Sequence, residues 1–166
     1  ILFWNADVTL MPARLHRDFL EMAVENTLVS PGKAQLLGSS VDLGLVKTDA
    51  YVVAGAADHL CDWESCYETV HLLGGSNRFV LSTSGHIAAI VNPPGNPKAD
   101  FQVSEQGSAS AQEFRKSAQR VAGTWWIDYV DWLRDRCGPE VPAPDELGGG
   151  GLVPLSDAPG TYVLER

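Results

Sequence analysis

The 166 residues are 45% hydrophobic and 20% charged, proportions that are typical of one globular domain and not of a disordered or fibrous chain. A formal net charge of −9 argues against a nucleic-acid partner, because such proteins normally present a basic surface. The apolar runs are too short to cross a bilayer, which needs about 18 consecutive residues.

The first residues, ILFWNADVTLMP, contain neither an initiator methionine nor the basic segment that opens a signal peptide. We therefore expect the chain to start within a longer protein or after processing. For residues 1–12 we expect the end of a strand that leads into a loop. Apolar residues at helical spacing then predict a helix from Ala13 to Val29, stopped by the Ser-Pro-Gly turn at residues 30–32. His16 on this helix is interpreted as a surface or capping residue and not as a ligand.

Residues 33–47 are expected to connect this helix to a core, with one short strand-like piece. Asp42 in this segment and Asp49 just after it are interpreted as connector residues and not as site residues. The continuous apolar run from Tyr51 to Gly55 then predicts a buried strand of a parallel sheet.

A helix from Glu64 to Leu73 and a second strand from Arg78 to Ser82 follow that strand. Strand, helix and strand with short links form one right-handed crossover unit, which brings the two strand ends to the same edge of the sheet. Asp58 follows the first strand and His86 follows the second. We therefore expect these two side chains to meet where open parallel sheets bind their ligands.

The rest of the chain carries weaker signals. The proline-rich segment 92–97 is expected to be irregular and to border the site, and residues 101–110 are expected to form a polar loop. Residues 111–136 predict a long amphipathic helix, interrupted at Gly123, with an aromatic face that packs on the sheet. Residues 138–151 are too rich in glycine and proline for a packed element, and the final segment is expected as an edge strand or as chain packed on the body.

An acid and a histidine in these positions are two members of a hydrolase-type triad. The carboxylate orients the imidazole and stabilises its protonated form, while the second ring nitrogen takes a proton from a nucleophile. His59 adjoins Asp58 and competes with His86, but neighbouring residues point apart, so His86 is preferred as the base. His71 lies in the predicted helix and is a weaker candidate. Each residue alone would be interpreted as structural.

The three cysteines, Cys61, Cys66 and Cys137, have no spacing that predicts a disulfide framework or a zinc site. None lies in the Gly-x-Cys-x-Gly turn expected for a nucleophile, so all three are interpreted as reduced and structural or incidental. The four consecutive glycines are not followed by the Lys-Ser/Thr pair of a phosphate loop. No metal or cofactor is therefore predicted.

Six segments resemble the poly(3-hydroxyalkanoate) synthase family over nearly the whole chain. They are WNAD-T--MP (residues 4–12), VAG--DHL--W (53–63), LLGG (72–75), FVLSTSGHIAAIVNPPGNPKA (79–99), GTWW (123–126) and APGTYV (158–163). The chain is similar to the carboxyl-terminal part of the catalytic domain of the single-polypeptide enzymes, with short- or medium-chain monomers. The resemblance implies an incomplete α/β-hydrolase fold, with parallel strands, crossover helices and part of a cap. It divides the chain into a cap-proximal connecting region (residues 1–50), a core (51–137) and a tail (138–166).

The resemblance also implies a function. The family joins (R)-3-hydroxyacyl-CoA units into polyester, releases coenzyme A and uses a Cys-His-Asp triad. Its acid falls on Asp58, which would orient His86 or assist the 3-hydroxyl of the incoming unit, and its base falls on His86. The nucleophilic cysteine is expected upstream of Ile1, so these residues alone are predicted to be inactive.

Further expectations from the family are a homodimer, to which Trp4 is a possible interface residue, and a cytoplasmic location at polyester granules. The substrate is a CoA thioester and no cofactor is required. Two alternatives stay open at this point: an esterase or depolymerase with a serine nucleophile, and a non-catalytic granule-binding fragment.

Overall fold

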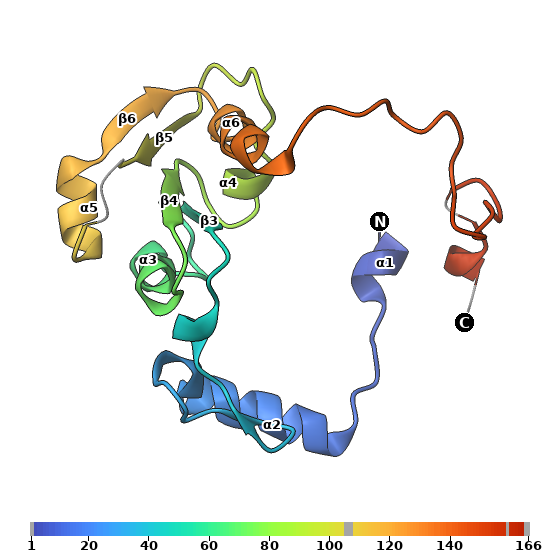
Figure 1. Cartoon of the computed structure of the whole chain (residues 1–166), viewed down its shortest axis with the longest axis horizontal. Coiled ribbons are helices and arrows are strands. Elements are labelled where there is room, and N and C mark those ends of the chain that lie inside the picture. Colours follow the sequence, from blue (N-terminus) through green and yellow to red (C-terminus); the bar gives the residue numbers. More distant parts are fainter. Residues whose placement is uncertain (1, 105–107, 159, 165–166) are drawn as a thin grey trace.

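A four-stranded sheet in the order β3-β4-β5-β6 forms the centre of the molecule (Figure 1). The computed structural model describes residues 2–104, 108–158 and 160–164. β3 and β4 are parallel and are joined by helix α3, as the crossover unit predicts. The bounds of these elements are β3 Ala50–Gly55, α3 Trp63–Leu72, β4 Asn77–Ser82, β5 Asp100–Val103 and β6 Gln119–Ala122.

A side-chain cap marks the start of α3, and a contact with the segment before β3 follows its end. The Asp62 carboxylate caps the helix by accepting a hydrogen bond from the Ser65 backbone N–H at 3.1 Å. After the helix, the Gly74 N–H donates to the Val46 carbonyl at 2.9 Å. A Cβ atom at Gly74 would lie 2.1 Å from the Gly44 carbonyl oxygen, so this close approach requires glycine.

The sheet is mixed, not parallel throughout as expected. β5 pairs antiparallel with β4, and β6 pairs antiparallel with β5. Only the short helix α4 (Ala88–Val91) and a proline-rich loop connect β4 to β5. This connection lets the chain turn back beside β4, so β5 occupies residues for which a polar loop was predicted.

The helix predicted over residues 111–136 is helical at both ends, but the interruption predicted at Gly123 is much longer than expected and contains a strand. Two helices, α5 (Ala111–Ser117) and α6 (Trp126–Cys137), flank the edge strand β6. Residues 119–122 pair with β5 through backbone hydrogen bonds that a helix would have to give up. Gly123, with a φ of +102°, lies at the junction with α6 and adopts a conformation that favours glycine.

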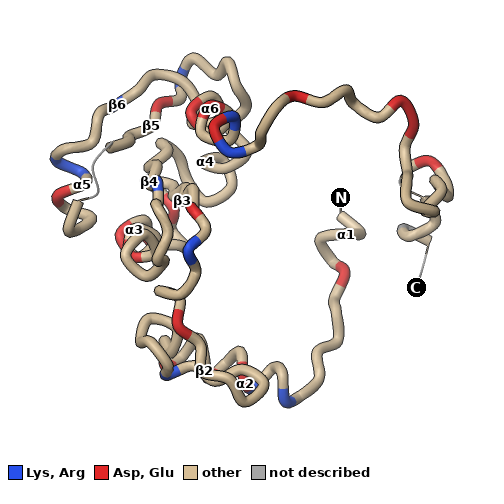
Figure 2. Tube along the Cα trace, in the orientation of Figure 1, with Lys and Arg blue, Asp and Glu red and all other residues tan. Residues whose placement is uncertain are grey.

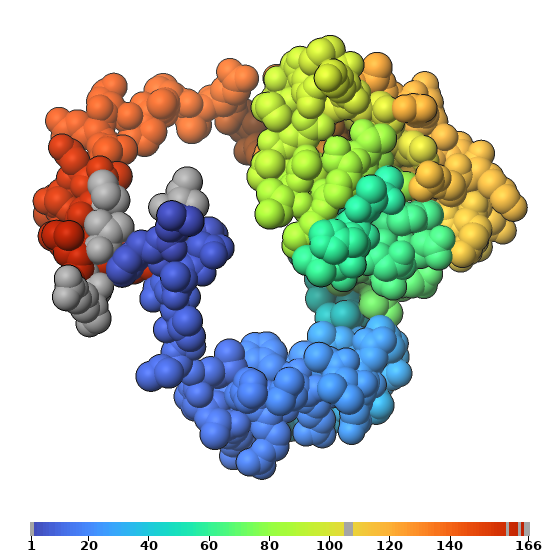
Figure 3. Space-filling view, turned by 180° about the vertical axis from the view of Figure 1, so that it is seen from behind, coloured from blue at the N-terminus to red at the C-terminus, as the bar shows by residue number. Residues whose placement is uncertain are grey.

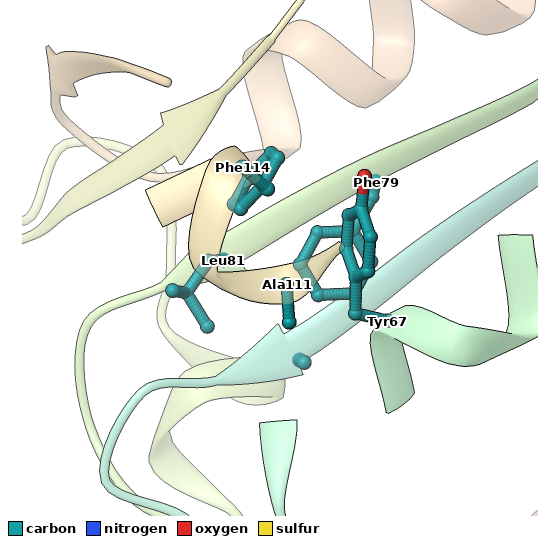
Figure 4. Close-up of a cluster of buried hydrophobic side chains, with 6 residues drawn as sticks. Tyr67, Phe79, Leu81, Ala111 and Phe114 are labelled. Atoms are coloured by element: carbon teal, nitrogen blue, oxygen red, sulfur yellow. The ribbon is translucent and has the colours of Figure 1, made fainter. Parts of the chain in front are cut away.

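Helices cover both faces of the sheet. On one face, strands β3 and β4 pack against α3 and α5 through Tyr67, Phe79, Leu81 and Phe114, with Ala54 and Ala111 between them (Figure 4). On the other face Val80, Phe101 and Val103 pack against Trp125, at the start of α6. Successive residues of β4 therefore point to opposite faces, as the two-residue period of a strand requires. The predicted aromatic packing of α6 on the sheet is confirmed.

A polar anchor fastens α6 to the strand starts. The Asp128 carboxylate accepts hydrogen bonds from the Tyr51 hydroxyl at 2.6 Å and from Nε of Arg78 at 2.9 Å. Burial opposes ionisation of Asp128, but these bonds outweigh it and hold the pKa of this carboxyl below its usual value. The anchor lies at the amino-terminal ends of β3 and β4.

Residues 2–49 form short elements beside this body. Residues 2–6 are a helix, α1 (Leu2–Ala6), where a strand end was expected. α2 (Ala13–Val24) is shorter than predicted because Asn26 adopts a left-handed turn, with φ of +48°, before the 3-10 turn Thr27–Val29. The hairpin β1–β2 (Gln35–Leu36 and Ser39–Ser40) and the 3-10 turn Leu43–Leu45 lead into β3.

The two ends of the chain extend from the body as arms that approach each other (Figure 3). The Tyr162 hydroxyl donates to the Asp7 carboxylate at 2.5 Å, and its ring meets that of Phe3 edge-on at 5.1 Å. Residues 162–164 form a 3-10 turn, so the C-terminal segment is not the edge strand considered from the sequence. The described part of the C-terminal arm, residues 138–158 and 160–164, contains Asp and Glu but no Lys or Arg (Figure 2).

Candidate catalytic dyad

Asp58 and His86 lie in two turns at the carboxyl-terminal edge of the parallel strands. β3 and β4 run in register from the Ala50–Asn77 pair to the Gly55–Ser82 pair, so both strands end at the same level. Beyond them, the Ala57 N–H donates to the Ser84 carbonyl at 3.0 Å. This bond joins the two turns, and it brings the predicted acid and the predicted base together.

The Asp58 carboxylate is held by its own turn. Its Oδ1 atom accepts hydrogen bonds from the backbone N–H groups of Leu60 and Cys61, at 2.8 and 2.9 Å. The Cys61 N–H is the main reason that the pKa of Asp58 falls from 3.8 to about 2, with smaller contributions from Leu60 and His86. The side chain is only 8% exposed. Asp58 is therefore an ionised, fixed hydrogen-bond acceptor near neutral pH.

His86 contacts that carboxylate through Nδ1, at 2.9 Å from Oδ2 and 3.1 Å from Oδ1. An ionised carboxylate can only accept, so Nδ1 carries the proton and donates it. In the neutral ring the lone pair is then on Nε2, the atom that a general base needs. The His86 side chain is 40% exposed, which leaves it accessible to a reacting group.

The backbone around His86 is braced from the opposite face of the sheet. The Ala89 N–H donates to the Gly85 carbonyl at 2.9 Å, which starts α4 directly after the histidine. The buried indole N–H of Trp125 donates to the Ala89 carbonyl at 2.8 Å. Ser84 has a φ of +110°, a strained conformation for a residue other than glycine. α6 and the sheet thus hold the turn that presents His86.

The other predicted residues lie in different settings. The His59 ring centre is 6.4 Å from that of His86, so His59 is a neighbour of the dyad. His71 packs on Tyr67 within α3, His16 is exposed on α2, and Trp4 is 70% exposed on α1.

The structure places Cys61 beside the dyad, a proximity that its spacing in the sequence did not predict. All three cysteines are free, but the Cys61 sulfur lies within 4.8 Å of ligand atoms of Asp58 and His86. The signal was present in the segment DHLC, because a turn after Asp58 brings the residue three positions later back to its carboxylate. Asp58, Cys61 and His86 are the described residues whose ligand atoms are close enough to hold one metal ion.

Relatives with related names match the whole chain. The chain is 43% identical over 166 residues to poly(3-hydroxyalkanoate) polymerase 1 of Ectopseudomonas oleovorans. The match covers 100% of this chain and 30% of that protein. The chain is 34% identical over 167 residues to the poly(3-hydroxyalkanoate) polymerase subunit PhaC of Cupriavidus necator, of which it covers 28%. The chain therefore spans less than a third of the length of these relatives.

One further comparison and one feature of the helices bear on the class of protein. No protein-family model matches the chain. In the part that the structure describes, no helix has both the length and the apolar character needed to cross a membrane. The match to several polymerases from end to end decides the relationship: the 166 residues are homologous to a segment of the poly(3-hydroxyalkanoate) polymerases.

Proposed function

We propose that this chain supplies the acid and the base of a polyester synthase that polymerises (R)-3-hydroxyacyl-CoA and releases coenzyme A. The observation that supports the proposal is the hydrogen bond between Asp58 and His86 at the edge of the parallel strands. The names of the relatives support a polymerase as its setting. On this proposal the sheet is part of an α/β-hydrolase fold.

In the proposed mechanism His86 Nε2 takes the proton of a cysteine thiol in another part of the polymerase. The thiolate attacks the acyl carbonyl, the bond from that carbon to the sulfur of coenzyme A breaks, and the leaving thiolate receives the proton from His86. The hydroxyl of a second hydroxyacyl unit, deprotonated by His86, then attacks the enzyme thioester; the bond from the acyl carbon to the cysteine sulfur breaks, and the cysteine thiolate receives the proton from His86. Asp58 keeps the imidazole in the required tautomer. Its low exposure and its contact with Nδ1 favour this orienting role over direct contact with the substrate hydroxyl.

A chimera tests the proposal. The matching segment of the Ectopseudomonas oleovorans polymerase 1 is replaced by this chain, and release of coenzyme A from 3-hydroxyacyl-CoA is followed with a thiol reagent. The chimera is expected to release coenzyme A and form polymer. His86→Ala should lower the rate by about 10²- to 10⁴-fold, the usual contribution of a general base.

His71→Ala is the matched control, because this histidine packs on Tyr67 in α3 and should leave the rate within about twofold. Circular dichroism checks that each variant folds. A chimera that folds but keeps its full rate without His86 would contradict the proposed role. A serine in the upstream nucleophile turn of the same protein would favour the serine-hydrolase alternative, and release of coenzyme A by the 166 residues alone would contradict the need for a nucleophile from elsewhere.

The proposed polymerase function also suggests which partners the protein has. A homodimer at the surface of polyester granules is the expected assembly, and the exposed Trp4 on α1 is a candidate contact. Trp4→Ala in the chimera should shift the dimer toward monomer in analytical ultracentrifugation if this residue lies in the interface.

A further inference from the structure

Three side chains that can each ligate a metal ion, the proposed base His86 among them, lie close together. Asp58 offers a carboxylate oxygen, Cys61 a sulfur and His86 a ring nitrogen, and these atoms all lie within 4.8 Å of one another. A set of one oxygen, one sulfur and one nitrogen suits Zn²⁺, whereas Mg²⁺ and Ca²⁺ prefer oxygen ligands only. Three protein ligands also leave a fourth tetrahedral position for water.

The turn after β3 already holds these ligands close to their places. Asp58 Oδ1 is bonded to the backbone N–H of Cys61 at 2.9 Å, which fixes the cysteine backbone relative to the carboxylate. Asp58 Oδ2 is 2.9 Å from His86 Nδ1. Tetrahedral zinc with bonds of about 2.0–2.3 Å needs ligand atoms about 3.3–3.8 Å apart. Zinc binding would therefore require two adjustments: the Asp58 oxygen and the His86 nitrogen would move apart from 2.9 Å, and the exposed Cys61 side chain would turn toward them.

We propose that Asp58, Cys61 and His86 form a Zn²⁺-binding site that switches off the Asp58–His86 pair. On binding, the Cys61 thiol loses its proton to solvent and zinc takes a lone pair of the His86 ring. The other ring nitrogen then carries the proton, so the imidazole has no lone pair left with which to act as a base. The inhibition rests on the proposed function, whereas the metal binding stands on the geometry alone.

Binding is measured on the 166-residue chain by titration with Zn²⁺ in competition with a chromophoric chelator. One ion per chain is expected at this site. Cys61→Ser and His86→Gln should each weaken the binding by about tenfold or more, because each removes a direct ligand. With Co²⁺ as a spectroscopic substitute, the wild-type chain should show a thiolate-to-metal charge-transfer band that Cys61→Ser lacks.

Matched controls come from neighbouring residues of the same types. Cys66→Ser, Cys137→Ser and His59→Gln should keep the affinity and the cobalt band, because none of these residues belongs to the cluster. Equal zinc affinity in wild type and Cys61→Ser overturns the site, as does loss of binding in His59→Gln with retention in His86→Gln. Circular dichroism of each variant separates loss of a ligand from loss of the fold.

The regulatory part is measured in the polymerase chimera. Zn²⁺ should slow release of coenzyme A, and the concentration for half inhibition should rise about tenfold or more in Cys61→Ser. Equal inhibition of both proteins overturns the switch even if the chain binds zinc. A chimera that folds but is inactive without metal contradicts the proposed function, and the titration of the 166-residue chain then still decides the metal site.

Discussion

At the scale of single residues, the turn after β3 keeps the Asp58 carboxylate ionised, so that it accepts hydrogen bonds throughout the physiological pH range. Two backbone N–H groups and the His86 ring all donate to one carboxylate, which is nearly buried. An acid in this setting orients a histidine over the whole physiological pH range. The same contacts tie folding to the charge of Asp58, because the unfolded chain has no such donors in place.

The first prediction follows from this charge. The pKa of Asp58 is about 2 in the fold, below its ordinary 3.8, so its stabilising effect is complete above the ordinary value and is lost as pH falls toward 2. Asp58→Asn removes this dependence. The difference in free energy of unfolding between wild type and variant should therefore shrink between about pH 5 and pH 2. Urea denaturation followed by circular dichroism across this range measures it, and a difference that does not change with pH would count against the assigned charge.

At the scale of elements, the dyad depends on how closely α4 approaches the end of β3. A Cβ atom on Gly55 would lie 2.9 Å from the Ala89 Cβ and 3.1 Å from the Ser84 carbonyl oxygen. Ala89 is also the residue whose carbonyl accepts the Trp125 indole N–H. β3, α4 and α6 therefore meet at one closely packed point beneath the turn that carries His86.

The second prediction concerns this contact. Gly55→Ala should destabilise the fold by about 1–3 kcal/mol, because the added methyl group forces α4 away from the sheet. The activity of the chimera should fall with it, since α4 begins two residues after His86. Gly149→Ala is the control: no atom lies within 4 Å of the added Cβ there. Urea denaturation compares the two variants, and equal stability would show that α4 moves aside without cost.

The third prediction separates the indole N–H from the rest of the Trp125 ring. Trp125→Phe keeps a buried aromatic side chain but leaves the Ala89 carbonyl without its donor, at a cost of about 1–3 kcal/mol. Trp126→Phe changes the stacked neighbour and leaves that hydrogen bond in place, so a smaller effect is expected. Urea denaturation measures both, and a larger loss in Trp126→Phe would contradict the bracing role.

At the scale of the whole molecule, a packed body carries two arms. The body has helices on both faces of the sheet, whereas the described arms contain many exposed apolar residues, among them Leu2, Leu10, Leu147 and Leu155. The arms meet through Tyr162, which contacts Asp7 and Phe3. These contacts involve a few exposed side chains away from the sheet, so they should add little to its stability.

The fourth prediction tests this independence. Tyr162→Ala should leave the free energy of unfolding of the body within about 0.5 kcal/mol, because the contacts are exposed and lie outside the core. Amide hydrogen exchange in Leu2–Ala6 should become faster, because the contacts of Asp7 and Phe3 with the tyrosine are lost. Leu155→Ala in the same arm, at a residue that is 96% exposed, serves as control and should change neither quantity. A cooperative loss of stability in Tyr162→Ala would show instead that arms and body fold as one unit.

The sequence by itself determined the centre of the molecule. Short apolar runs predicted β3 and β4, helical spacing predicted α3, and the parallel arrangement of the two strands predicted that Asp58 and His86 would meet. These signals are local, because each depends on the side chains within one element or on the rule for one short crossover. The catalytic roles of the two residues stay predictions.

Only the tertiary structure decided the rest of the sheet and the setting of the dyad. Residues 119–122 lie inside a segment with helical spacing, yet they form β6 because β5 supplies hydrogen-bond partners that no local pattern reveals. β5 in turn exists because the chain turns back after α4. Cys61 looked incidental by its spacing, and it reaches the dyad because backbone donors to Asp58 close the turn that carries it. β5 and β6 thus depend on pairing between residues distant in sequence, whereas Cys61 joins the dyad through a short turn whose partner His86 comes from the next strand.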